Sequence, residues 1–298
     1  MSSKHYFNIA EHYVCIVFSS NNTEDNISLL PSFVPFSTEA TSDGSFFTLT
    51  VDNSIDRINE NGLRPVIESD TGNGIITVGQ TATGTYQFII KDNSNKECCI
   101  LQSNNDFTEA KCSIYGDCSM KRFGLNDALM IMYAFRGSFF NTLLIHASVV
   151  ENNGYGYAFI AKSGVGKSTH SRLWLENIDG TILLNDDNPI IRVIDGYAYI
   201  YGSPWSGKTP CYKQRKAKLG AIVKIVRDKH NEINECLPYV AFGNTLSACS
   251  NLKNDKTVSR NTSDNVIRLI ETMPNNYVLQ CRPDKEAAFV CHTKVAKA

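Results

Sequence analysis

The stretch AKSGVGKS at residues 161–168 decides how the second half of this chain is read. The apolar run YGYAFIA (155–161) predicts a strand before it, and KSTHSRLWLENI (167–178) predicts a helix after it. A strand that leads through a glycine-rich turn into a helix directs backbone N–H groups and the positive end of the helix at one point, which favours a bound phosphate. The predicted phosphate-binding residues are Ser163, Gly164, Val165, Gly166, Lys167, Ser168 and Thr169.

A second stretch, GSPWSGKT (202–209), competes for this role because it satisfies the pattern G-x-x-x-x-G-K-[ST] letter for letter. The first stretch has Ala161 in place of the leading glycine. In the second stretch, however, Pro204 offers no backbone N–H, and PCYKQRKAKLG (210–220) has too few apolar residues to bury a helix face. We therefore predict that the imperfect match binds phosphate; the alternative is a Gly/Ser turn before a helix. We expect Trp205 to be a packing residue; the alternative is a platform for adenine.

An acid pair follows the predicted loop and helix. TILLNDD (181–187) predicts a strand that ends in Asp186 and Asp187. Beside nucleotide phosphates, one carboxylate can hold magnesium and the other can accept a proton from an attacking hydroxyl. We expect Asp187 to hold the metal and Asp186 to act as the base; the alternative is a solvated turn before Asn188 and Pro189.

A histidine stands on the strand that we predict before the phosphate-binding segment. His146 lies within LLIHASVVE (143–151), an apolar run that predicts one strand. Next to an aspartate in a cleft, an imidazole can tune the carboxylate or relay a proton. The alternative is a histidine that is simply packed in the core.

The run from His146 through SGVGKST to LLNDD resembles the core of the HPr kinase/phosphorylase family and, more broadly, kinases with the phosphoenolpyruvate-carboxykinase type of phosphate loop. The resemblance covers roughly residues 140–230. It implies transfer of the γ-phosphate of ATP to a serine hydroxyl, with Asp186 as base and with Asp187 and Ser168 at Mg²⁺. It further implies contact of Lys167 with the phosphates and an aspartate partner for His146.

Three departures from that family concern the acceptor. Ala161 replaces the leading glycine, Thr169 stands where the bacterial HPr kinases usually have glutamate, and their E-x-R-G-x-G signature is not visible. In its place, GSPWSGKTPCYKQRKAK (202–218) is similar to a segment of HPr-kinase-like proteins classed as serine kinases. The HPr substrate and the phosphorylase activity therefore do not carry over.

The segment 208–229 is strongly basic. Lys208, Lys213 and Arg215 follow a strand of the same predicted sheet, where they could reach the nucleotide or the transferred phosphoryl group. The alternative is a solvated loop and strand edge.

These features favour an ATP-dependent, magnesium-requiring kinase that acts on a hydroxyl of an unknown acceptor, a protein serine or a small molecule. The alternative, from a different class, is a nucleotide-binding regulatory or scaffold module that has lost transfer. A carboxykinase ranks third because the chain is short for that family.

The fold class that we predict is α+β or α/β, in two parts. Residues 1–124 contain short β-branched and aromatic runs separated by polar turns, which predicts a β-rich region of unknown role. From residue 125 the helical spacing of GLNDALMIMYAFRGSFF (124–140) and the pattern described above predict a P-loop kinase domain over 125–298. A soft boundary near residue 125 separates the two parts.

Composition limits the partners. The formal net charge is −1, which gives no argument for a nucleic acid partner or an anionic membrane surface, and we expect no nucleic acid partner. No apolar run approaches a membrane span. The N-terminus has no secretory pattern, and the ten cysteines have no paired C-x-x-C spacing. We expect a cytoplasmic protein with a nucleotide partner and no membrane partner; the resembling kinases form oligomers, so a homo-oligomer is also expected.

Overall fold

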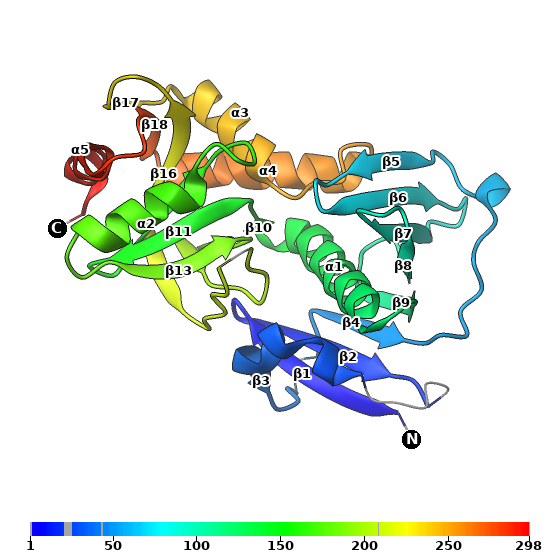
Figure 1. Cartoon of the computed structure of the whole chain (residues 1–298). Helices are drawn as coiled ribbons and strands as arrows, with labels where there is room; N and C mark the ends of the chain where they lie inside the picture. Colours follow the sequence, from blue (N-terminus) through cyan, green and yellow to red (C-terminus); the bar gives the residue numbers. More distant parts are fainter. Residues whose placement is uncertain (1, 21–25, 43, 208, 298) are drawn as a thin grey trace. The chain divides into compact units, whose positions relative to one another are not determined.

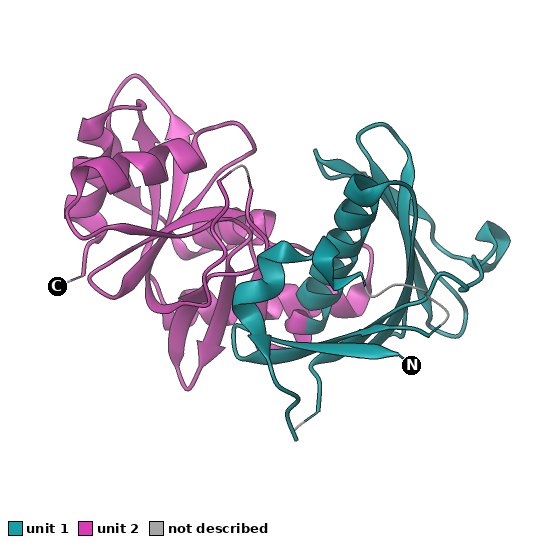
Figure 2. Ribbon diagram, turned by 60° about the horizontal axis from the view of Figure 1, so that its bottom comes forward, with its two compact units in different colours: residues 1–136 teal, residues 137–298 magenta. Residues whose placement is uncertain are grey.

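The chain folds as a mixed α/β protein with two large sheets and a few helices. The computed structural model describes residues 2–20, 26–42, 44–207 and 209–297. Two compact units divide it, Met1–Arg136 and Gly137–Ala298 (Figure 2). The sequence predicts a division near residue 125, whereas the boundary between the two units lies between Arg136 and Gly137, near the end of a helix that begins at Cys118.

The first unit is a nine-stranded sheet that curves around the long helix α1 (Cys118–Gly137) (Figures 1 and 2). The strand order is β3-β1-β2-β4-β9-β8-β7-β6-β5. A Cβ atom at Gly124 would lie 2.6 Å from the carbonyl oxygen of Cys98, so the helix lies directly on the sheet at this glycine. The strands are β1 (Ser3–Ile9), β2 (His12–Phe18), β3 (Ser37–Thr38), β4 (Phe47–Val51), β5 (Ile67–Asp70), β6 (Gly74–Gln80), β7 (Tyr86–Asp92), β8 (Glu97–Ser103) and β9 (Glu109–Ile114).

The second unit is built on a mixed sheet in the order β10-β14-β15-β16-β12-β11-β13, with β18 also paired to β16 and β17 paired to β18. The long strand β16 pairs with β12 on one edge, and on the other edge with β15 and then with β18. The strands are β10 (Thr142–Leu144), β11 (Ala147–Asn152), β12 (Tyr155–Ile160), β13 (Ile182–Asp187), β14 (Ile190–Ile194), β15 (Tyr197–Tyr201), β16 (Lys216–Arg227), β17 (Glu232–Glu235) and β18 (Asn276–Cys281).

Helices cover both faces of the second sheet, because its central strands are apolar on both sides. Val149 and Ala158 pack in a core with α3 and α4, whereas their neighbours Val150 and Phe159 pack in a core with α2 and α5. The helices are α2 (Lys167–Asn177), α3 (Pro238–Ala248), α4 (Lys256–Thr272) and α5 (Lys285–Val295). Aspartates cap two of them: Asp255 accepts from the Val258 N–H at 2.7 Å and Asp284 from the Ala287 N–H at 3.1 Å.

Two β-hairpins form in the second unit. β11 and β12 pair around Asn153 and Gly154, and β14 and β15 pair around Asp195 and Gly196. All four turn residues have positive φ, as a two-residue hairpin turn that matches the strand twist requires.

The prediction of one strand over 143–151 is wrong. β10 ends at Leu144 and β11 begins at Ala147. Between them, Ile145 forms an isolated bridge with Cys249, and the His146 N–H donates to the Ala248 carbonyl at 2.7 Å. The break places His146 just before β11 rather than within a strand. In the part of the chain that the structure describes, no helix combines the length and apolarity needed to cross a membrane.

Candidate functional site

The segment between β12 and α2 has the backbone of a strand–turn–helix loop. Gly164 and Gly166 have φ values of 75° and 131°, which L side chains rarely adopt. The first helical bond runs from the His170 N–H to the Gly166 carbonyl at 2.9 Å. The preceding amides, from Lys167 to Thr169, are therefore not used by the helix and remain at its positive end.

Arg227, the last residue of β16, holds this loop from outside. Its Nε donates to the Val165 carbonyl at 2.9 Å, and its Nη2 donates to the Gly164 carbonyl. Two carbonyl oxygens of the loop are thus bound to a cation on the neighbouring strand. In the sequence, Arg227 stands out only as part of the basic segment 208–229. The role of Arg227 follows from its position at the end of β16, which runs parallel to β12 and so ends near the loop.

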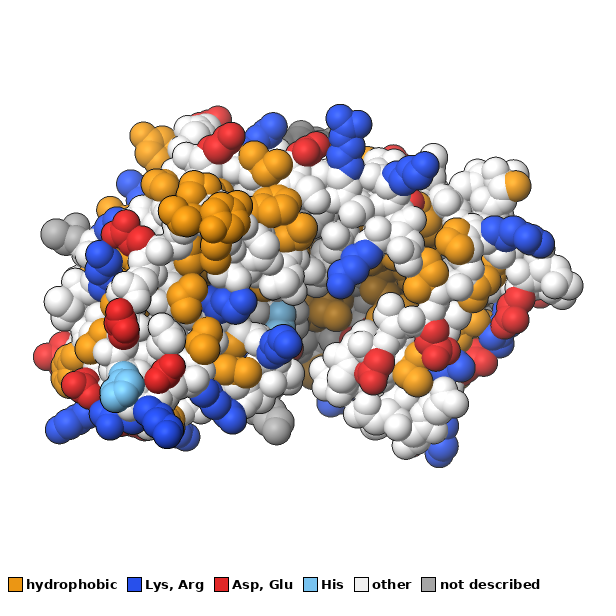
Figure 3. Space-filling model, turned by 90° about the horizontal axis from the view of Figure 1, so that it is seen from above, with side chains coloured by type: hydrophobic (Ala, Val, Ile, Leu, Met, Phe, Trp, Pro, Cys, Tyr) orange, Lys and Arg blue, Asp and Glu red, His pale blue; other side chains and the backbone are white. Residues whose placement is uncertain are grey.

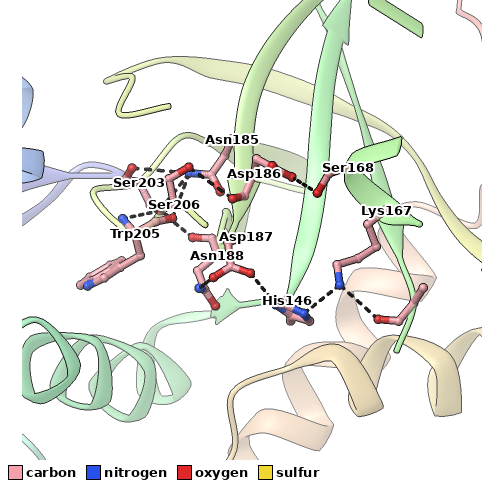
Figure 4. A network of polar contacts seen from close by, with 11 residues as sticks. His146, Lys167, Ser168, Asn185, Asp186, Asp187, Asn188, Ser203, Trp205 and Ser206 are labelled. Atoms are coloured by element: carbon pink, nitrogen blue, oxygen red, sulfur yellow. Dashed lines mark hydrogen bonds and ion pairs between the residues drawn. The ribbon is translucent and has the colours of Figure 1, made fainter. Parts of the chain in front are cut away.

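Lys167 is the buried cation of the site. It is only 8% exposed, and its Nζ lies 2.7 Å from Nε2 of His146 and 3.4 Å from the Ala161 carbonyl oxygen (Figure 4). Burial lowers the pKa of the Lys167 ammonium, and the carboxylates of Asp187 and Asp186 act in the opposite direction.

His146 joins Lys167 to Asp187. Its Nδ1 lies 3.0 Å from Oδ1 of Asp187, on the side of the ring opposite the lysine. An imidazole with its proton on Nδ1 would donate to Asp187 and would accept from the Lys167 ammonium at Nε2. The predicted aspartate partner of His146 is therefore Asp187.

The backbone of Asp187 is strained. Its φ is 152°, a conformation that costs a non-glycine residue about 1–3 kcal/mol and persists only when the surroundings hold it. The carboxylate is held on its second oxygen by Asn188, whose Nδ2 donates to Oδ2 at 2.8 Å.

Asp186 contacts a different partner. It is 5% exposed, and Oδ1 accepts a hydrogen bond from the Ser168 hydroxyl at 2.8 Å (Figure 4). The sequence had grouped Ser168 with Asp187 and had given Asp186 the role of base. The contacts group Ser168 with Asp186, and Asp187 with His146.

The donors near Ser168 suit a hard cation. A serine hydroxyl and a carboxylate are oxygen ligands of the kind that Mg²⁺ uses together with water and substrate phosphates. Among the described residues, no group of three or more histidine, cysteine or acidic side chains could hold a metal ion by itself. The residues present therefore fit a magnesium ion that is bound jointly with phosphate.

The second candidate stretch lies on the acid-bearing strand and not at a helix. After β15 the chain from 202 to 215 is not helical in its described residues, and Trp205 is 3% exposed, in accord with a packing role. Ser206 forms an isolated bridge with Asp187. Lys208, which completes the pattern, lies outside the described residues.

The basic residues that follow are bound away from the loop. Lys213 donates to the Leu183 carbonyl at 2.6 Å, and Arg215 forms an ion pair with the buried Glu151. In this structure both side chains of the predicted basic segment are therefore engaged with β13 and β11. Sequence reasoning missed instead the neighbours of the acid pair, Asn185 and Asn188.

Helix α3 borders the site, and the sequence had not predicted it. The carbonyl of its last residue, Ala248, accepts from the His146 N–H. At its start, Leu237 and Tyr239 are 59% and 73% exposed. Figure 3 shows a group of hydrophobic side chains on one face of the molecule. The helix that fixes the backbone of His146 thus also offers an apolar surface.

Comparison with known proteins adds no relative: no family model matches the chain, and no curated protein is significantly similar to it.

Proposed function

We propose that this chain is an ATP-dependent kinase that transfers the γ-phosphate to a hydroxyl acceptor. The observation that carries the proposal is the meeting of two pairs at the loop: Ser168 with Asp186, and His146 with Asp187. Lys167 connects the two pairs, because it precedes Ser168 in the chain and its Nζ lies 2.7 Å from Nε2 of His146. Phosphate neutralisation, metal binding and proton acceptance would each have a group at this place.

The loop amides from Ser163 to Thr169, together with Lys167, would bind the phosphates. Lys167 would turn from His146 to the phosphate oxygens, because a charge-assisted bond to phosphate is stronger than a bond to a neutral imidazole. Ser168 and Asp186 would hold Mg²⁺, which when bound supplies positive charge to the phosphate oxygens.

His146 and Asp187 would accept the proton. Once Lys167 has turned away, Nε2 of His146 is free to take the proton of the acceptor hydroxyl as its oxygen bonds to the γ-phosphorus. The bond from the γ-phosphorus to the bridging oxygen breaks, and its electron pair leaves with ADP. Asp187 would orient the ring through Nδ1 and stabilise the imidazolium.

A binding experiment tests the first half of the proposal. ATP with and without Mg²⁺ is titrated into the wild-type chain, into Lys167→Ala and into the control Lys253→Ala, which removes an exposed lysine. We expect Lys167→Ala to weaken ATP binding by at least about tenfold, because one charge-assisted bond contributes roughly 1.5–3 kcal/mol. Equal affinities in all three proteins would overturn the assignment of the loop.

Transfer from γ-labelled ATP to a panel of serine-containing proteins and hydroxyl-bearing small molecules tests the second half. The wild-type chain is compared with His146→Gln, which cannot serve as the base. Labelling that is lost in the variant supports a kinase. Binding of ATP–Mg²⁺ with equal, negligible labelling in both proteins would instead identify a nucleotide-binding module.

A further inference from the structure

The stretch GSPWSG (202–207), here the GSPWSG segment, lies against the strand that carries the acid pair, and both of its glycines lie close to neighbouring parts of the chain. A Cβ atom at Gly202 would lie 2.1 Å from the Lys213 carbonyl oxygen and 3.2 Å from that of Leu184. A Cβ atom at Gly207 would lie 3.2 Å from the Asp186 carbonyl oxygen and 3.3 Å from Cβ of Asp187. Close packing on β13 thus explains the glycines that make this segment match a phosphate-loop pattern.

Backbone contacts fasten the end of the segment to the acid pair. The Gly207 N–H donates to the Asp186 carbonyl at 2.6 Å. The Ser206 hydroxyl lies 3.2 Å from the same oxygen and 2.6 Å from the Thr209 carbonyl oxygen, which is its shorter acceptor. Ser206 and Asp187 form a bridge. The backbone of the acid pair is therefore held from one side by the end of the segment.

Buried side chains anchor the start of the segment on both sides of the acid pair. Asn185 and Ser203 are fully buried, and the Asn185 amide donates to the Ser203 hydroxyl at 3.2 Å and to the Trp205 carbonyl at 3.3 Å (Figure 4). The Ser203 hydroxyl donates to the Asn188 carbonyl at 2.6 Å. The residues immediately before and after the two aspartates are thus tied to one serine.

We propose that the GSPWSG segment is a positioning element that keeps Asp187 in its strained backbone conformation and so directs its carboxylate to Nδ1 of His146. Its contacts surround the one residue of the site whose φ of 152° needs external support. The catalytic consequence rests on the proposed function, whereas the structural consequence, the proton on Nδ1 of His146, does not.

Gly207→Ala tests the proposal, because its methyl group would press on Asp186 and Asp187 without touching the loop. Gly243→Ala is the matched control: Gly243 lies in α3 and has open space where a Cβ would be added. The first readout is the ¹⁵N spectrum of the imidazole of His146 at fixed pH, assigned with His146→Gln. We expect one tautomer, protonated at Nδ1, in the wild type and in Gly243→Ala, and a shift of protonation toward Nε2 in Gly207→Ala.

The second readout separates positioning from binding. In Gly207→Ala we expect the Kd for ATP–Mg²⁺ to stay within twofold of the wild type while labelling of an acceptor, or of water, falls at least tenfold. Ser203→Ala is a second variant in case Gly207→Ala does not fold. It adds no atoms, removes the hydroxyl that binds Asn185 and Asn188, and should shift the same tautomer signal. An unchanged His146 spectrum in both variants would overturn the proposal. If the wild type binds no ATP but Gly207→Ala still shifts the His146 tautomer, the proposed function is overturned and the positioning role of the segment stands.

Discussion

The Ser168 hydroxyl donates to Asp186 at 2.8 Å, whereas Asp187, the next residue of the same strand, turns to His146 at 3.0 Å. Neighbouring residues of a strand point to opposite faces, so two adjacent acids serve two different partners. A resemblance carried over by position had paired Ser168 with Asp187. The contacts favour the opposite allocation, and substitution of each acid distinguishes the two.

Asp186→Asn and Asp187→Asn make the same chemical change at adjacent positions and should fail differently. In Asp186→Asn, we expect loss of the increase in ATP affinity that Mg²⁺ produces, because the carboxylate beside Ser168 is gone. In Asp187→Asn, affinity for ATP–Mg²⁺ should persist while transfer falls about 10²-fold or more, the range for loss of acid–base help. Titrations of ATP with and without Mg²⁺ measure binding, and labelled transfer measures catalysis. If the two variants show each other's expected phenotype, Asp187 holds the metal and Asp186 is the base.

Arg227→Ala should weaken nucleotide binding indirectly, because Arg227 binds the loop and not the nucleotide. Its guanidinium holds the Gly164 and Val165 carbonyls, and loss of bonds of this kind at an exposed site is worth about 1 kcal/mol, or roughly fivefold in Kd. Hydrogen exchange of residues 162–166 should become faster. Arg260→Ala, which removes an exposed arginine of α4, should change neither quantity.

His170 predicts loss of stability in acid for the second unit. Burial lowers the pKa of His170 to about 4, and its neutral Nε2 accepts from Nε1 of Trp174 at 3.1 Å. Because the unfolded chain binds this proton near pH 6.5 and the folded chain does not, stability is lost as the pH falls from about 6.5 to 4, by about 3 kcal/mol. Both tryptophans belong to this unit, so tryptophan fluorescence during urea unfolding follows it.

His170→Gln keeps an acceptor for Trp174 and should remove most of that acid sensitivity. His230→Gln, at an exposed histidine, is the control and should retain the wild-type slope. A wild-type stability that is flat between pH 6.5 and 4.5 would contradict the prediction.

Asp127 predicts the opposite pH dependence for the first unit. Burial in α1 raises the pKa of Asp127 to about 7, so the folded unit binds a proton that the unfolded chain releases near pH 4. Stability is therefore present below about pH 4 and lost as the pH rises toward 7, and Asp127→Asn should stabilise the unit at pH 8 by about 4 kcal/mol. Native-state hydrogen exchange of α1 and β8 measures it; Asp56→Asn, at an exposed acid, should have no such effect.

Local chemistry explains what could be predicted from the sequence. The loop at 161–168, the strand that ends in the acid pair and both hairpins follow from glycine positions, turn residues and apolar periodicity. These signals lie within a few residues of the structure that they determine. They sufficed to identify the segment that has a strand–turn–helix backbone, although the other stretch matches the pattern better in its letters.

Tertiary contacts explain what could not be predicted. The mainly apolar run 143–151 predicts one strand, but Ile145 pairs with Cys249 and the strand breaks at His146. The allocation of the two acids depends on the register of β13 against β11, and the role of Gly207 depends on a neighbour twenty residues away in the chain. Helix α1 joined the first unit because Gly124 fits against Cys98, a contact that helical spacing alone does not reveal.

Strand β16 has a consequence for how a ligand would meet the loop. It is paired along both edges, and its last residue, Arg227, still pairs with Cys281. Amides in such a strand exchange with solvent only when large parts of a domain open. The loop that Arg227 holds is therefore tethered to one of the least mobile parts of the chain, and an incoming anion would find it already ordered. The loop would then lose little conformational entropy when the anion binds, so less of the favourable interaction energy would be offset.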